Sequence, residues 1–382
     1  MAEELATQHV FVTGRLCLFG EHSDWAGEYR AEERFDPAIL PGRTLVIGTN
    51  EGLHARVNRL AEHVLVFQGI TSAGDTHGPR RFPLDDEKAL EQEAAAGGFW
   101  SYVAGTALCV MRELEKRGVR QSVQGLNIDN HNSTLPACKG LSSSAAVCVL
   151  VARAFSAAYN LQFDVRTEME LAYQGEVATP SQCGRMDQAC AYGSTPVVLT
   201  FDGNDVTAEP LPLGGTVRLV FADLEASKDT VTILRGLRAA YPVATTDAHA
   251  KLHRFLGEQN TDIVSRASAA LAKGDAAALG ALMVEAQAAF DAAAMPLVPS
   301  QLEAPVLHRV LADERVRALS LGGKGVGSQG DGSVQFVCAT AAQQQELCEL
   351  LEREFHMSPY HLTMEVNTKA PAPEHVPSAA AV

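Results

Sequence analysis

Residues 136–146 read PACKGLSSSAA and run directly into an apolar, alanine-rich stretch at 147–155. The pattern predicts a loop that leads into the N-terminus of a helix. The first backbone N–H groups of a helix have no partner inside it and the helix dipole is positive there, so such a turn binds anions. Serine hydroxyls in the turn can donate to phosphate oxygens or bind Mg²⁺. The alternative is an ordinary serine cap on a buried helix.

The composition is that of a globular chain with room for more than one core. The chain has 382 residues, 46% of them hydrophobic and 20% charged, which favours two domains. The formal net charge of −15 disfavours a nucleic-acid partner or an anionic membrane surface, although a local site for a nucleotide stays compatible with it. No uninterrupted run of about 18 apolar residues predicts a membrane span.

The eight cysteines are scattered and form no CxxC pair. We therefore expect reduced thiols, a cytoplasmic protein and no structural zinc site. The N-terminal residues lack the basic segment and apolar run of a signal peptide. The tail at 370–382 is rich in proline and alanine, and we expect it to be disordered.

Hydrophobic periodicity gives a coarse secondary structure for the first half. Residues 8–20 read as two strands joined by a Gly-Arg turn, and 44–49 and 53–57 as two further strands. Residues 28–43 read as a loop, and 71–98 as a surface excursion with little regular structure. Helices are predicted at 100–117, through the apolar run 147–155 that follows the serine-rich loop, and at 165–178, and strands at 64–67, 123–128 and 196–201.

The second half begins after glycines and prolines at 210–215, which mark the predicted domain boundary. A strand is expected from 217, followed by an alanine-rich helical region at 229–293 that breaks near Tyr241-Pro242 and Lys273-Gly274. Helices are also predicted at 304–312 and 341–355, and strands at 334–338 and 360–366.

Two polar clusters are candidate functional sites. The segment EHSDW at 21–25 follows a strand and could hold sugar hydroxyls or a metal, although a solvated turn explains it as well. The segment CGRMDQ at 183–188 places Asp187 among small residues, which favours a catalytic aspartate over a surface cap.

Four blocks together resemble the GHMP kinase superfamily, which includes galactokinases, mevalonate kinases and homoserine kinases. They are GRLCLFGEHSDWAG at 14–27, PACKGLSSSAA at 136–146, GRMDQ at 184–188 and GGKGVGSQGDGS at 322–333. No GxxxxGK[ST] occurs, so the chain is not a P-loop kinase. The resemblance implies an α+β fold of two domains, N-terminal ribosomal S5 domain 2-like and C-terminal ferredoxin-like (an α/β plait). We place the domains at 1–212 and 213–369.

The resemblance also implies ATP-dependent phosphoryl transfer, with MgATP as donor. Residues 139–145 would bind ATP, namely Lys139, Gly140, Leu141, Ser142, Ser143, Ser144 and Ala145. Ser144 and Glu176 look like the Mg²⁺ ligands of relatives, and Asp187 like their catalytic aspartate. Arg15 stands where galactokinases carry an arginine, and would stabilise charge in the transition state. Gly323–Gly332 would brace the phosphate loop.

The acceptor implied by the resemblance is a monosaccharide phosphorylated at its anomeric hydroxyl. The EHSDW segment is similar to the EHTDY element of galactokinases, so Glu21, His22 and Asp24 would bind sugar hydroxyls. Arg185 replaces an apolar residue of the family and could meet an acidic substrate group or form a structural ion pair. Galactose, a pentose or a sugar acid therefore stay open as acceptors.

The sequence departs from the family at several points and leaves other functions open. Cys138 replaces a glycine of the phosphate loop, and no arginine-rich element is recognisable at 227–238. A mevalonate-type alcohol kinase or a non-catalytic ATP- and sugar-binding sensor are the alternatives. The presence of both Arg15 and Asp187 favours an enzyme over a sensor. We expect a monomer or homodimer whose partners are ATP and a small sugar.

Overall fold

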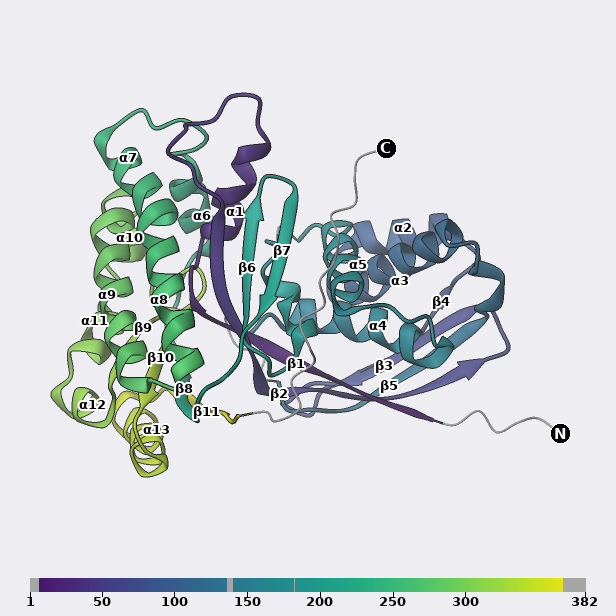
Figure 1. The fold of residues 1–382 in the computed structure, drawn as a ribbon. Helices are drawn as coiled ribbons and strands as arrows, with labels where there is room; N and C mark the ends of the chain where they lie inside the picture. Colours follow the sequence, from purple (N-terminus) through teal and green to yellow (C-terminus); the bar gives the residue numbers. More distant parts are fainter. Residues whose placement is uncertain (1–6, 136–139, 182, 367–382) are drawn as a thin grey trace.

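The computed structural model describes residues 7–135, 140–181 and 183–366, so Lys139 and the tail at 370–382 lie outside the described residues. Within them the chain forms two sheets with helices packed against both (Figure 1). This architecture confirms the predicted α+β fold. The larger sheet has seven strands in the order β4-β3-β5-β2-β6-β7, with β1 paired to β2. Its strands are β1 Gln8–Phe19, β2 Gly42–Leu60, β3 Val64–Ile70, β4 Thr76–Pro83, β5 Gly125–Ser133, β6 Val197–Asp202 and β7 Asp205–Pro210.

The two longest strands run through the positions where the sequence predicted breaks. A single strand β1 replaces the expected strand, turn and strand, and β2 is likewise continuous. The pairing of β1 with β2 shifts register between Thr13 and Arg15 and again between Cys17 and Phe19. Such an irregularity re-aims a side chain without ending the strand. Arg15 stands at the first of them.

The expectation of an irregular excursion at 71–98 is wrong. Strand β4 pairs with β3, and helix α2 (Glu87–Ala96) follows it. The strand lies at the edge of the sheet, where charged side chains are usual, so its polar composition concealed it. The helix buries only Leu90 and Ala94, and the Asp86 carboxylate caps it by accepting from the Ala89 N–H.

Three helices pack together beside the larger sheet and shape the first core. They are α3 (Phe99–Lys116), α4 (Ser143–Tyr159) and α5 (Val165–Val177). Helix α4 is the one predicted after the serine-rich loop, and it packs on both β1 and β2. The 3-10 helix η3 (Asp187–Tyr192) carries the second polar cluster and contacts α4, α5 and β1. A short 3-10 turn, η2 (Arg120–Ser122), leads into β5.

The second half forms a four-stranded antiparallel sheet in the order β11-β8-β10-β9. Its strands are β8 Val217–Asp223, β9 Gly322–Gly325, β10 Ser333–Cys338 and β11 Ser358–Met364. Its helices are α6 Thr230–Arg238, α7 Asp247–Arg254, α8 Asn260–Lys273, α9 Ala276–Ala294, α10 Pro299–Leu302, α11 Pro305–Ala312, α12 Glu314–Leu319 and α13 Ala341–Phe355. A π-helical turn, η4 (Phe255–Gln259), joins α7 to α8, and a 3-10 turn, η5 (Met295–Leu297), precedes α10.

The segment after β1 packs into the second half of the chain. Part of the region predicted as polar turn and loop is helical, as α1 (Ser23–Glu28) and the 3-10 turn η1 (Tyr29–Ala31). Trp25 and Ile39 share a buried cluster with Tyr241, Phe255 and Phe290. The first polar cluster of the sequence therefore lies at the junction of the two halves, where α1 stands beside α6 (Figure 1).

One helix among the described residues is long and apolar enough to cross a membrane, namely residues 276–297. Half of its most apolar window is buried within the protein. Helix α9 in this segment packs on α8, β9 and β10. These contacts are those of a central helix in the second half.

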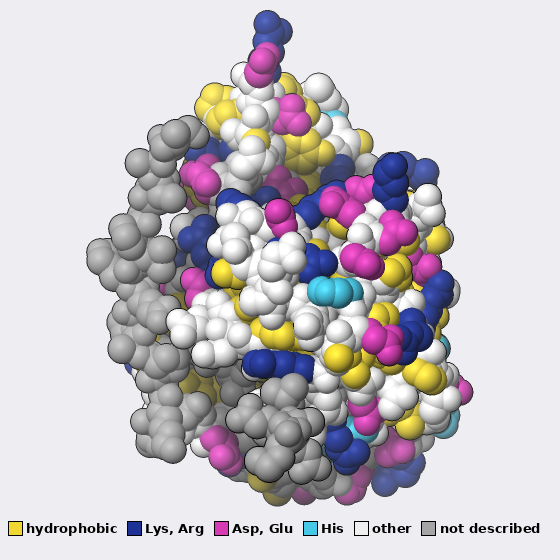
Figure 2. All heavy atoms as spheres, turned by 90° about the vertical axis from the view of Figure 1, so that its right-hand side faces the viewer, with side chains coloured by type: hydrophobic (Ala, Val, Ile, Leu, Met, Phe, Trp, Pro, Cys, Tyr) yellow, Lys and Arg dark blue, Asp and Glu magenta, His cyan; other side chains and the backbone are white. Residues whose placement is uncertain are grey.

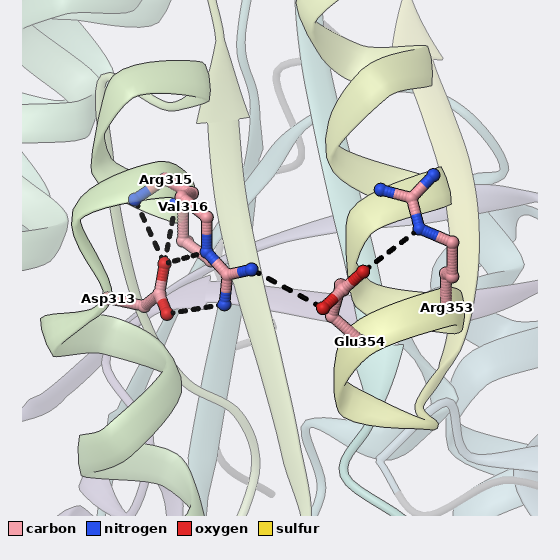
Figure 3. A network of polar contacts seen from close by, with 5 residues as sticks. All are labelled: Asp313, Arg315, Val316, Arg353 and Glu354. Carbon is pink, nitrogen blue, oxygen red and sulfur yellow. Dashed lines mark hydrogen bonds and ion pairs between the residues drawn. The ribbon is translucent and has the colours of Figure 1, made fainter.

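Charged side chains of both signs are interspersed over the outer face of the first half (Figure 2). Figure 3 shows acidic and basic side chains that also alternate around α12 and α13 in the second half. Asp313 caps α12 by accepting from the Arg315 and Val316 N–H groups, and Arg315 also reaches Glu354 on α13. Exposed pairs of this kind contribute little stability individually, but these connect two neighbouring helices.

Candidate active site

A pocket of about 380 Å³ opens where the two halves meet. Its walls combine Arg15 of β1, the start of α1, the serine-rich turn, the segment leading into η3 with its first residue, helix α6 and the third glycine block. The residues lining it are Arg15, His22, Asp24, Trp25, Gly140, Ser142, Ser143, Ser144, Cys183, Gly184, Met186, Asp187, Lys228, Thr230, Leu234, Arg238, Gly327 and Ser328. The structure thus brings together residues from all four blocks of the sequence.

One wall is the start of helix α4. Ser142 precedes the helix with a left-handed backbone (φ 54°), and no side chain caps the first turn of the helix in the described residues. Gly140 also has a positive φ of 101°, and it lies against Val326 of the third glycine block. The backbone N–H of Arg15 donates to the Leu141 carbonyl at 3.1 Å, which ties this turn to β1. The wall therefore offers backbone N–H groups and serine hydroxyls to an anion.

Arg15, Asp187 and Ser142 form a compact triad in the pocket. The Arg15 Nη2 donates to Asp187 Oδ1 and, at 2.5 Å, to Ser142 Oγ, and the Ser142 hydroxyl donates to the same Asp187 oxygen at 3.0 Å. Arg15 is almost fully buried, whereas the Asp187 side chain is 26% exposed. The Nε and Nη1 of Arg15 have no hydrogen-bond partner among the described residues. Both atoms are buried, and leaving such donors without an acceptor is costly.

Behind the serine turn, Ser144 is joined to Glu176. The Ser144 hydroxyl donates to Glu176 Oε1 at 2.7 Å, and the Gln188 amide donates to Oε2 at 2.8 Å. Burial, reinforced by the charge of Asp187, raises the pKa of Glu176 to about 7. A buried carboxylate with a raised pKa is stabilised by a nearby cation, so this pair fits Mg²⁺. No group of three or more His, Cys, Asp or Glu side chains suited to a metal occurs in the described part of the chain.

Asp24 faces the pocket from the first turn of α1. Its side chain is buried, and that burial, together with the charge of Asp187, raises its pKa to about 6. The approach of Asp24 requires glycine at position 184, because a Cβ there would lie 2.1 Å from Asp24 Oδ2. The two polar clusters predicted from the sequence are therefore in contact.

His22 presents a defined hydrogen-bond donor to the pocket. The Trp25 indole N–H donates to His22 Nδ1 at 3.0 Å, so the neutral ring carries its proton on Nε2. Burial lowers the pKa of His22 to about 4, which keeps the ring neutral. The Nε2 atom lies near the Ser328 backbone but completes no hydrogen bond of good geometry among the described residues. The ring of His22 lines the pocket, and this N–H is buried in the pocket wall.

Glu21 does not line the pocket, although the sequence placed it with His22 and Asp24. Its carboxylate pairs with Lys324 of β9, and both side chains are almost completely buried. Lys324 also donates to the Gly325 carbonyl at 2.8 Å. Burial raises the pKa of Glu21 despite the opposing charge of Lys324. In this geometry Glu21 connects the acceptor segment to the second sheet.

Arg185 lies outside the pocket as well. Its guanidinium donates to the Asn204 carbonyl at 2.8 Å and stacks over Tyr173, with 4.7 Å to the ring centroid. It lines a separate hollow with Arg166 and Tyr192. Arg185 is thus held by the first half of the chain, and the pocket does not include it.

Sequence reasoning missed the contribution of helix α6. Thr230, Leu234 and Arg238 line the pocket at intervals of four residues, which places them on one face of the helix. Lys228 lies just before the helix and packs against Gly332. The four-residue spacing of these side chains is visible in the sequence, but residues 227–238 contain no recognisable motif that would mark the spacing as functional.

The pocket can hold a polyphosphate along the helix N-terminus and a hydroxylated acceptor beside Asp24 and His22, with the Arg15–Asp187 pair between them. That arrangement is typical of a small-molecule kinase.

Comparisons with known proteins support the same class of enzyme. Residues 101–194 match the sequence profile of the GHMP kinases N terminal domain. A galactokinase from Thermococcus kodakarensis is 28% identical over 302 residues, covering 72% of this chain and 76% of that protein.

Solved structures give the same result for the whole fold. Lactococcus lactis galactokinase complexed with galactose has a TM-score of 0.64 at 17% identity and covers 95% of this chain and 94% of that one. The mevalonate kinase of L. major, in complex with R-mevalonate, has a TM-score of 0.63 at 19% identity, covering 94% and 97%. The mevalonate kinase of Methanococcus jannaschii has a TM-score of 0.66 at 15% identity and covers 95% of this chain and 100% of that one. The chain thus carries a segment similar to the GHMP kinases N terminal domain, within a fold that it shares with galactokinase and mevalonate kinases, and these similarities support a sugar or alcohol kinase.

Proposed function

We propose that this protein transfers the γ-phosphoryl group of MgATP to the anomeric hydroxyl of a monosaccharide. The observation that carries the proposal is the position of the Arg15–Asp187 pair. It contacts the serine turn through Ser142, and it lies near Asp24, whose pKa is raised by burial and by the charge of Asp187. A phosphoryl group bound at the turn and a hydroxyl bound at Asp24 would meet at this pair.

The donor side rests on the start of α4 and the third glycine block. Gly140 and the serines at 142–144 would surround the phosphates of ATP, and Lys228 with Ser328 would close the pocket over them. Ser144 and Glu176 would hold Mg²⁺ together with phosphate oxygens, because Mg²⁺ is usually bound through one or two carboxylates and the substrate's phosphates. The ion supplies neutralisation of charge on the transferring group.

The chemistry required of the protein is modest in such a reaction. Asp187 would accept the proton of the acceptor hydroxyl as its oxygen attacks the γ-phosphorus and ADP leaves in line. Arg15 lines the pocket, and its fixed positive charge would stabilise the negative charge that develops. The hydrogen bond from Ser142 holds the Asp187 carboxylate toward the pocket.

A sugar acceptor is supported by the acceptor wall and by the relative. His22 offers a donor and Asp24 an acceptor in fixed positions, a combination that suits vicinal hydroxyls. The 28% identical relative is a galactokinase. We also propose that the chain divides into domains at 212/213 and acts in the cytoplasm, where the free cysteines of the described residues would stay reduced.

The test is ADP release from MgATP against a panel of acceptors. The panel contains galactose, arabinose, glucose, galacturonic and glucuronic acids, and mevalonate. Turnover with one or more sugars, and not with mevalonate, supports the proposal. Turnover with mevalonate alone would contradict the sugar assignment. ATP binding without turnover of any acceptor would instead favour a sensor.

A further inference from the structure

The cations of the pocket differ in what surrounds them. Arg15 is paired with Asp187, and Lys228 lies along the third glycine block on the phosphate side. Positive charge reaches His22 from both Lys228 and Arg238, and of the two it is Arg238 that lies over the ring of the acceptor segment. Its guanidinium lies over the ring of Trp25, at 5.5 Å from the centroid, and Trp25 belongs to the acceptor segment.

Arg238 forms no hydrogen bond or ion pair of its own within the described residues, and its buried Nε lacks an acceptor there. Burial raises the pKa of the Glu28 carboxyl, and the charges of Arg185 and then Arg238 oppose that rise. A guanidinium fixed by stacking on an indole keeps its planar donors in one orientation. Such a fork matches the two oxygens of a carboxylate.

The position of Arg238 on its helix aims it at the acceptor. It is the last of the three α6 residues that line the pocket, whereas Ile233 and Leu237 of the same helix are buried in the core. Arg235, one turn earlier, is exposed. Arg238 and His22 both contact Trp25, through stacking and through the indole N–H respectively. The cation therefore shares a wall with the residues proposed to bind sugar hydroxyls.

We propose that the acceptor of this kinase carries a carboxylate that Arg238 binds, so that the enzyme acts on a sugar acid in preference to the neutral sugar. The inference rests on the proposed function and names the substrate class for the same site. It transfers to Arg238 the role that the sequence suggested for Arg185, which the structure places in another hollow.

A series of three sugars that differ only in the group at C5 isolates the effect of a carboxylate on the activity. L-Arabinose, D-galactose and D-galacturonic acid share their configuration at C2–C4 and differ at C5, which carries a hydrogen, a hydroxymethyl group or a carboxylate. Xylose, glucose and glucuronic acid form a second series. For the wild-type enzyme we expect kcat/KM to be at least tenfold higher for the acid than for the neutral members of one series.

Arg238→Gln should lower the acid-to-neutral ratio of kcat/KM by about 10- to 100-fold, the range expected for a charge-assisted bidentate contact. Arg238→Lys should recover part of the ratio through KM. Arg235→Gln removes the same charge from the exposed side of α6 and should leave the ratio unchanged. Melting temperatures measured for each variant establish that it is folded.

Two results would overturn the inference. One is a wild-type enzyme that phosphorylates neutral sugars as well as it does the acids. The other is an Arg238→Gln variant whose activity falls equally on all acceptors, which would assign Arg238 to the nucleotide or to folding. Both leave phosphoryl transfer to a sugar intact. A failure of the proposed function appears differently, as an absence of turnover with every sugar, and calorimetric titration of galacturonate and galactose then decides the acid preference directly.

Discussion

Asp187 is the residue on which the proposed chemistry depends, because it contacts both Arg15 and the serine turn. Asp187→Asn keeps the shape of the side chain but removes its basicity. We expect kcat to fall by about 10²- to 10⁴-fold, the usual contribution of general base catalysis. ATP affinity, measured by calorimetry, should change little. A variant with near-normal kcat would exclude Asp187 as the base.

Glu176 is predicted to act through the metal. Glu176→Gln retains the hydrogen bond from Ser144 but removes the carboxylate charge. We expect the Mg²⁺ concentration needed for half-maximal activity to rise by about tenfold or more, because the ion loses its only charged protein ligand in the proposed site. Titration of activity with Mg²⁺ at saturating ATP measures this. An unchanged Mg²⁺ requirement would remove Glu176 from the metal site.

At the scale of residues, the sequence predicted which side chains gather at the site better than it predicted what each of them contacts. Arg15, Asp24, Ser142 and Asp187 meet in one pocket as their motifs implied. Glu21 turns to Lys324 instead, since a buried carboxylate needs an opposite charge and the second sheet supplies one. No local pattern in the sequence reveals that pairing, because it joins residues at opposite ends of the chain.

Among the elements, β9 links the acceptor segment to the second half through the buried Glu21–Lys324 pair. Lys324→Met should destabilise the protein by about 3–5 kcal/mol, because it leaves the carboxylate buried without a partner. The double variant Glu21→Gln/Lys324→Met should recover much of the loss. Denaturant unfolding measures both.

The matched control for this pair is Arg266→Met, which breaks two exposed pairs, with Asp262 and Glu285, and should cost about 1 kcal/mol or less for each. If the Lys324 variant were no less stable than this control, the pair would not join the halves. If the double variant were as unstable as Lys324→Met, packing and not charge would explain the loss.

Helices α9 and α11 are connected by a pH-sensitive contact. His308 Nε2 lies 2.9 Å from Asp291, and its Nδ1 lies 2.8 Å from the Glu303 carbonyl. Burial alone would lower the pKa of His308, but Asp291 and the carbonyls raise it above its usual value. The charged ring therefore stabilises the fold below about pH 6.5, and that stabilisation is lost as the pH rises through the raised pKa.

His308→Gln should accordingly lower the melting temperature more at pH 6 than at pH 9. Thermal unfolding across this range tests the difference, with the exposed His131→Gln as control. An equal effect at both pH values would show that the contact is not electrostatic.

At the scale of elements, hydrophobic periodicity predicted the buried helices and strands well, and it predicted the elements at the periphery of the fold poorly. Helix 341–355 was predicted with the bounds of α13, since its apolar face repeats regularly. Strand β4 was missed because it is an edge strand with charged side chains, and helix α2 was missed because it buries only one narrow row of apolar side chains. The face of α6 that lines the pocket escaped notice because four-residue spacing in so short a helix is a weak signal.

For the whole molecule, the pocket exists only because the two halves pack together. The N-terminal half supplies the serine turn and Asp187, and the C-terminal half supplies α6 and the third glycine block. The packing of Trp25 among Tyr241, Phe255 and Phe290 fixes the acceptor segment at this junction. The resemblance of the motifs predicted a site between halves, but the cations that line its acceptor side required the structure.

The most direct test of phosphoryl transfer is a ³¹P NMR spectrum of the protein with MgATP and the acceptor sugar that gives turnover. The account predicts that the γ-phosphate signal of ATP is replaced, one for one, by ADP and by a sugar 1-phosphate. Asp187→Asn should give neither at a comparable rate. Inorganic phosphate as the only new product, or a phosphorylated sugar formed equally by Asp187→Asn, would contradict it.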